Sequence, residues 1–165
     1  MNEELSQLID ALREELTQYG ELLALMEEQQ ELIVNRQPQE LLDNLARVNS
    51  QMEKIASARE ARETGKSAVT KVISAPKDIS FREMTDQLPE EYRPLLDALV
   101  EEINTLLEHI QKWLRQNHLL LQRSLDLMQR LVQEVFPQSK PKTYSNRGYV
   151  SPVNPPPSSL YEGLI

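Results

Sequence analysis

Apolar residues recur at helical spacing along the chain, and the stretch from residue 94 to residue 135 has the widest apolar side. One row of residues in this stretch alternates three and four positions apart, which is the spacing of a packed helix seam. This first row comprises Leu96, Leu99, Ile103, Leu106, Ile110, Trp113, Asn117, Leu120, Ser124, Leu127 and Leu131. A second row, repeating every seven residues beside it, comprises Val100, Leu107, Leu114, Leu121, Met128 and Val135. We expect one long helix with more apolar side than a single partner helix covers.

Residues 5–33 show a second helical pattern. Its predicted seam is Leu5, Ile9, Leu12, Leu16, Tyr19, Leu23, Met26, Gln30 and Ile33. Pro38 then interrupts the pattern, because proline has no amide hydrogen and disfavours helix at the preceding residue. Apolar spacing resumes at Leu41 and fades toward Gly65, which we interpret as a helix end, with the alternative that residues 66–73 carry one or two further helical turns. The sequence leaves open whether Pro38 starts a second helix or only kinks one long helix.

Two segments lack this long-helix pattern. Residues 74–93 contain Pro76, Pro89 and clusters of turn-forming residues, so we expect a connector with one short helix near residues 80–87, anchored by Phe81 and Met84. Residues 137–165 hold six of the ten prolines, and such a sequence buries too little apolar area to offset its ordering entropy. We therefore predict an all-α fold, an elongated antiparallel helical bundle of three main long helices over residues 1–136, followed by an extended proline-rich tail over residues 137–165.

Charge and composition narrow the range of partners. The chain has a net charge of −8, and residues 1–35 hold nine acidic residues against Arg13 alone. Such an acidic helix repels phosphate backbones, which argues against nucleic-acid binding. There is no cysteine for a disulfide. Acidic residues stand where a signal peptide would carry basic ones, and no apolar run reaches about 18 residues, so we expect a cytoplasmic protein without membrane insertion.

The sequence offers little for catalysis. His109 and His118 lie nine residues apart, on roughly opposite sides of a helix, and neither follows a glutamate by three residues. The four glycines are isolated and form no phosphate-binding loop. Adjacent glutamates such as Glu14 and Glu15 point about 100° apart on a helix, so we interpret them as a solvated face. We predict no enzyme activity, no cofactor, no metal site and no catalytic residue.

The second row has two interpretations. It could pack against the first two helical segments, as a three-helix bundle requires, or part of it could bind a helix of a partner. We favour partner binding for residues 121–135 and interpret Asn117 as a buried polar residue that sets helix register. The predicted partner-binding residues are Leu114, Leu121, Leu125, Met128, Val132 and Val135. The alternative is a generic helical adaptor or a coiled-coil homodimer that uses this surface for self-association.

Three features together resemble the FlgN family, the export chaperones for flagellar hook-associated proteins. They are the leucine-rich acidic first helix, the run Asn117-His118-Leu119-Leu120-Leu121-Gln122-Arg123-Ser124-Leu125, and Thr143-Tyr144 followed by Gly148. The resemblance implies a protein that binds the terminal helices of hook-associated proteins, prevents their premature assembly, and delivers them to the type III export apparatus. It also implies contact with the export gate or its ATPase components, with Tyr144 as the gate-contacting residue.

Overall fold

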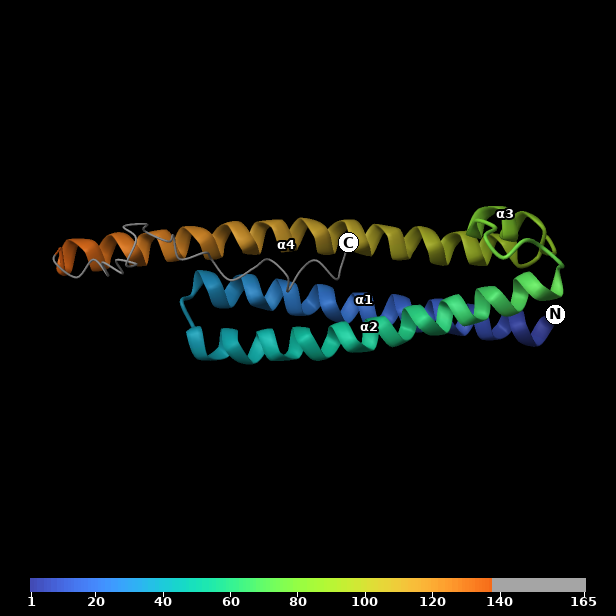
Figure 1. Ribbon diagram of the computed structural model, residues 1–165, viewed down its shortest axis with the longest axis horizontal. Coiled ribbons are helices and arrows are strands. Elements are labelled where there is room, and N and C mark those ends of the chain that lie inside the picture. Colours follow the sequence, from blue (N-terminus) through green and yellow to red (C-terminus); the bar gives the residue numbers. More distant parts are fainter. Residues whose placement is uncertain (138–165) are drawn as a thin grey trace, which may run out of the picture. The chain divides into compact units, whose positions relative to one another are not determined.

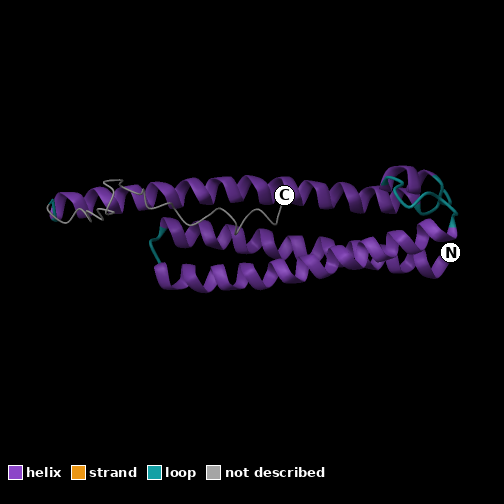
Figure 2. Ribbon diagram, in the orientation of Figure 1, coloured by secondary structure: helices purple, strands orange, loops and turns teal. Residues whose placement is uncertain are grey.

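The protein is all-α in the part that its computed structural model describes, residues 1–137. Four helices occupy this range, and it contains no strand (Figure 2). They are α1 (Asn2–Val34), α2 (Pro38–Val72), α3 (Phe81–Asp86) and α4 (Arg93–Val135). Three of them are long, with 33, 35 and 43 residues in α1, α2 and α4. The predicted all-α helical bundle is confirmed.

The chain divides into two compact units, and the division lies inside α4. Unit 1 is Met1–Asn117, and unit 2 begins at His118. The sequence placed a boundary later, near residue 136, where the prolines begin. Residues 138–165 lie outside the described range, so the predicted extended tail stays a prediction.

The turn between α1 and α2 answers the question about Pro38. Helix α1 ends at Val34, and the Arg36 and Gln37 amides donate hydrogen bonds back to the Ile33 and Leu32 carbonyls at 3.2 and 3.0 Å. This is the Schellman arrangement, which requires a left-handed residue, here Arg36 with φ of 54°. Pro38 is the first residue of α2, where its missing amide hydrogen costs nothing. Pro38 therefore starts a second helix, and α1 and α2 run side by side in opposite directions (Figure 1).

The connector contains the expected short helix. Ser80 caps α3: its hydroxyl accepts a hydrogen bond from the Glu83 amide, and the Glu83 carboxylate accepts one from the Ser80 amide. Met84 and Leu88 are fully buried, whereas Phe81 is only half-buried. The Arg93 guanidinium donates to the Leu88 carbonyl at 2.8 Å, which ties the start of α4 to the connector. Met84 is thus the stronger of the two predicted anchors.

The α1 seam differs from the predicted one by one residue at four places, and at the first of these both Leu8 and the predicted Ile9 are buried. Glu15, Leu22 and Gln29 are buried, whereas Leu16, Leu23 and Gln30 are only half-buried. The observed seam keeps the alternating spacing of three and four: Leu5, Leu8, Leu12, Glu15, Tyr19, Leu22, Met26, Gln29 and Ile33. The opposing α2 seam contains Asn44, Val48, Gln51, Ile55, Ala58, Gly65 and Val69. Both seams therefore carry buried polar residues among the apolar ones.

Gly65 lies inside α2 and does not end it. The helix continues to Val72, and Gly65 is buried where α2 passes Leu8 of α1. A Cβ atom at this position would lie 3.1 Å from the Cα of Leu8. A side chain here would be in tight contact with the Leu8 backbone, so the glycine suits this close approach of the two helices, and the prediction of a helix end at Gly65 is wrong.

Candidate interaction surface

A layer of three buried amides joins α1, α2 and α4 at the end of unit 1. The Asn117 amide group donates to the Met26 carbonyl at 2.8 Å and to the Gln29 side-chain oxygen at 3.1 Å. The Gln29 amide group donates in turn to Asn44 Oδ1 at 3.2 Å, and Asn44 Nδ2 donates to the Leu25 carbonyl at 3.0 Å. These hydrogen bonds form only in one alignment, so the layer fixes the register of all three helices, although Asn117 Oδ1 is buried with no hydrogen-bond partner among the described residues.

A charged cluster is buried nearer the middle of the hairpin. Glu15 is fully buried, and its Oε1 accepts hydrogen bonds from Arg62 Nη1 at 2.9 Å and from the Tyr19 hydroxyl at 3.0 Å. Burial, followed by the negative charge of Glu15, raises the pKa of Tyr19 to about 12. The prediction that Glu15 belongs to a solvated face is therefore wrong, because Arg62 on α2 supplies the charge that makes its burial tolerable.

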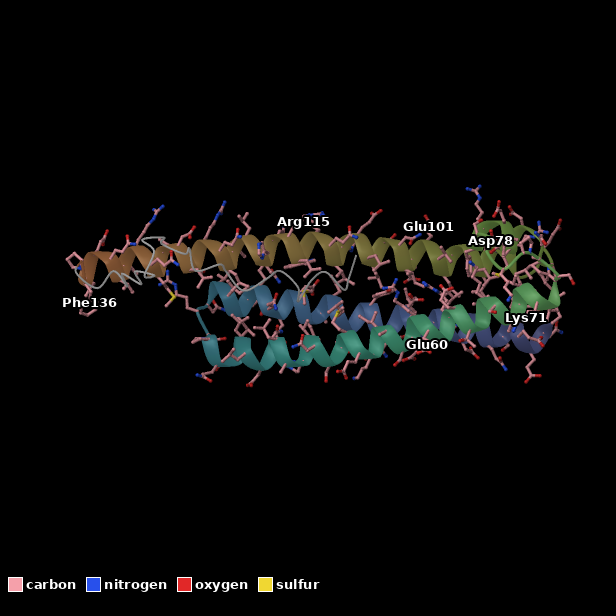
Figure 3. All side chains as sticks on the ribbon, in the orientation of Figure 1. Glu60, Lys71, Asp78, Glu101, Arg115 and Phe136 are labelled. Carbon is pink, nitrogen blue, oxygen red and sulfur yellow. The ribbon has the colours of Figure 1, made fainter. Side chains whose placement is uncertain are left out.

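Beyond Asn117, the apolar side of α4 is largely open to solvent. Leu120 and Leu121 are half-buried, and exposed fractions rise to between 53% and 65% at the following apolar positions. We define the α4 apolar face as Leu120, Leu121, Leu125, Leu127, Met128, Leu131, Val132 and Val135. Phe136, labelled in Figure 3, follows directly and is 61% exposed. An exposed apolar surface of this kind is a candidate interaction site.

The opposite side of α4 is polar in unit 1. Glu101 and Arg115 are exposed on the side of α4 away from α1 (Figure 3). In unit 2 the residues outside the α4 apolar face include Gln122, Gln129 and Gln133, all exposed. Most of the exposed apolar side chains of unit 2 are therefore gathered on one side of the helix, as they are on a helix that packs against a partner, and Leu119, 47% exposed, lies on the other side.

The predicted partner-binding residues fall into two groups. Leu125, Met128, Val132 and Val135 are exposed, and Leu121 is half-buried. A correction applies to Leu114, which is only 8% exposed and belongs to the core of unit 1. It lies one turn before the amide layer at Asn117, where α4 is still covered within its own chain.

Sequence reasoning also missed members of the surface. Leu127 and Leu131 are exposed, although the first row assigned them to a packed seam. Their spacing is the same as that of the buried residues Leu96 and Ile103 earlier in α4, so periodicity gave no signal that the cover ends. Whether a helix face is buried depends on how far the neighbouring helices extend, and the local spacing of apolar residues does not contain that information.

The described residues contain no arrangement typical of a catalytic or metal centre. Within residues 1–137, no group of three or more histidine, cysteine, aspartate or glutamate side chains could hold a metal ion. In the same range, no helix combines the length and apolar character needed to cross a membrane. The hollows of unit 1 are shallow and open, such as the one lined by Pro76, Asp78 and Glu83. The α4 apolar face is therefore the strongest candidate site.

A protein-family model, described as FlgN protein, matches residues 1–152. The chain belongs to the FlgN family. No curated protein and no solved structure gave a significant match. FlgN proteins are flagellar export chaperones that bind flagellar proteins, and this general role applies to the chain.

The position of the α4 apolar face agrees with the residues that carry the FlgN resemblance. The run Asn117 to Leu125, which carried part of the resemblance, begins in the buried amide layer and continues into the exposed apolar face. FlgN is a chaperone family, which agrees with a site made of apolar side chains rather than reactive ones. Tyr144, the expected export-gate contact, lies outside the described residues.

Proposed function

We propose that the chain is a cytoplasmic chaperone for flagellar hook-associated proteins and that it holds their terminal helices against the α4 apolar face. In this role it prevents the clients from assembling prematurely and delivers them to the type III export apparatus. The observation that carries the proposal is the exposure of a continuous apolar helix side, in a chain of a chaperone family. An amphipathic client helix would bury its own apolar side against that surface.

The exposed side chains can supply an adequate binding energy. Burying a whole leucine or valine side chain contributes about 1.5–3 kcal/mol, so burying the exposed half of each contributes about 1 kcal/mol. The face offers six side chains that are more than half exposed. With matching burial on the client, the gross gain is of order 10 kcal/mol, and ordering and association offset part of it. Micromolar or tighter affinity follows, which suits a chaperone that must later release its client.

The proposal is tested with purified chaperone and full-length hook-associated proteins. Size-exclusion chromatography should show a complex, and calorimetry should give its dissociation constant. Leu125→Asp and Met128→Asp should each weaken binding at least tenfold, because each places a charge in the apolar contact. Circular dichroism should show unchanged helix content, since both side chains are exposed.

Gln129→Asp is the matched control for these variants. It adds the same charge within the same turns of α4 but lies outside the apolar face, so it should leave affinity unchanged. The absence of a complex with any hook-associated protein would refute the proposal. Unfolding of both Leu125→Asp and Met128→Asp would show instead that these residues belong to a core.

We further propose that Tyr144 contacts the export gate. The proposal rests on the position of Tyr144 shortly after the last long helix, as the FlgN resemblance implies. Tyr144→Ala should retain client binding yet lower client secretion, and Tyr149→Ala is the matched control in the same segment. Equal secretion by Tyr144→Ala and the unmodified protein would refute this role.

Self-association through the same face is the alternative function, and sedimentation of the chaperone without client distinguishes it. A generic adaptor or coiled-coil homodimer requires a stable dimer at concentrations where the client complex forms. A monomer that forms a complex on addition of client would support the chaperone function.

A further inference from the structure

A third row of residues in α4 changes from polar to apolar where unit 2 begins. This row repeats every seven residues beside the second row, on the side away from the first. Its members are Asp97, Asn104, Gln111, His118, Leu125 and Val132. Leu125 and Val132 are 54% and 53% exposed. Counted at about 100° per residue, the apolar side of α4 then extends over about 160°, from Leu127 to Leu125.

In unit 1 the apolar side of α4 is narrower, and it is buried within the protein's own chain. There the third row is polar, and the buried residues of α4, such as Leu96, Ile103 and Leu114, belong to the first two rows. The long helices of unit 1 available to cover them are α1 and α2. The Asn117 amide is bonded to α1 and linked through Gln29 to α2, so both helices adjoin the end of this two-row stretch of α4.

One helix is too narrow for the wider face of unit 2. An arc of about 160° on a helix of about 5–6 Å radius extends roughly 15 Å around the helix surface, and a straight helix packed with its axis about 8–10 Å away contacts only the part of that arc that faces it. A single helix seated over Met128 would leave the flank of Leu127 and Leu131, or that of Leu125 and Val132, in water. Both flanks are more than half exposed in the free protein.

We propose that the α4 apolar face receives two client helices side by side, one against the Leu127 flank and one against the Leu125 flank. The inference rests on the proposed chaperone function and specifies its partner as a pair of amphipathic helices from one client chain. A second copy of this protein fits less well, because a homodimer brings only one such α4 stretch to the other. It would cover the face with one helix.

Site-specific photo-crosslinking of the client complex tests this arrangement. A benzoylphenylalanine is placed at position 125, 127 or 129, the last as the control outside the face, and the chaperone is mixed with full-length hook-associated protein. Mass spectrometry then maps the linked client residues. Positions 125 and 127 should link to two client segments that are far apart in the client sequence, and position 129 should link weakly.

Paired substitutions give a second measurement. Leu125→Gln with Val132→Gln, and Leu127→Gln with Leu131→Gln, should each weaken binding by about thirtyfold, since each pair removes two half-exposed apolar contacts. In the variant with Leu125→Gln and Val132→Gln, crosslinks from position 127 should persist, because the client helix against the Leu127 flank keeps its contacts.

Four outcomes would overturn the inference. Crosslinks from positions 125 and 127 to one client segment, or loss of affinity from only one pair of substitutions, would show a single docked helix. If the free protein sediments as an assembly of four chains, copies of the chain bury the α4 apolar face in place of client helices. Failure to form any complex would overturn the chaperone function itself, so the two proposals fail in distinguishable ways.

Discussion

Gly65 and Gly20 form a matched pair for testing the close approach of α1 and α2. Both are interior helix positions, so alanine gains about 0.5–1 kcal/mol of helix stability over glycine at either one. Their surroundings differ. A Cβ atom at position 65 would lie 3.1 Å from Leu8 Cα and 3.4 Å from Leu8 Cβ and Cδ1, whereas a Cβ atom at position 20 would meet nothing within 4 Å.

We expect the two substitutions to have opposite effects on the free energy of unfolding. Gly20→Ala should raise it by about 0.5–1 kcal/mol, which is the helix propensity gain alone. Gly65→Ala adds a methyl group against the Leu8 backbone, which cannot rotate away as a side chain could. Overpacking of this kind costs about 1–3 kcal/mol, so the net effect should be a loss of up to about 2 kcal/mol.

Urea unfolding followed by far-ultraviolet circular dichroism measures both values, and an unchanged m-value shows that compactness is unaltered. Gly65→Ser extends the series, because its side chain also begins with a Cβ atom and should destabilise the protein as well. If Gly65→Ala stabilises the protein as much as Gly20→Ala does, the close contact with Leu8 is absent and the account of this glycine fails.

Three further predictions concern the turn, the charged cluster and the amide layer. Arg36→Gly should raise the free energy of unfolding by about 0.5–1 kcal/mol in urea titrations, because glycine adopts the left-handed φ of 54° without strain; a loss would contradict this. The pKa of Tyr19 is raised from 10 to about 12, so the stabilisation that Tyr19 gives the folded protein is complete below about pH 10 and is lost as the pH rises through about 12. Tyr19→Phe should therefore flatten the fall in the free energy of unfolding over this pH range. An unchanged profile would assign the fall to other groups. Asn117→Ala should cost about 1–3 kcal/mol, since the Met26 carbonyl and the Gln29 side-chain oxygen lose a buried donor; thermal unfolding within error of the unmodified protein would show that water replaces it.

Much of the fold could be predicted from the sequence, because helix existence depends on local periodicity. The long stretches were visible in that pattern, and turn-forming residues indicated the short helix near residues 80–87. The sequence left open whether Pro38 breaks or kinks the first helical segment. The sequence did not show which residues form the buried α1 seam, because Leu16 and Leu23 are apolar and Glu15 is charged. The buried position of Glu15 depends on Arg62, 47 residues away, and a local pattern does not contain such a partner.

Less of the candidate site could be predicted. The sequence located the surplus apolar surface in the last part of α4, and Leu125 and Met128 are indeed exposed. It did not show where α4 ceases to be buried within its own chain, so Leu114 was assigned to the surface and Leu131 to a seam. The end of the cover coincides with the amide layer at Asn117, which is a tertiary feature built from three helices.

The exposure of the last part of α4 also bears on how quickly a client can be released. Residues 118–135 form a helix whose side chains mostly face water, so its order depends largely on its own backbone hydrogen bonds. Helices of about this length are only marginally stable in isolation, and their amide hydrogens exchange readily. In the proposed complex, ordering of this stretch by a client would consume part of the contact energy, so the client should dissociate faster than the contact area alone implies.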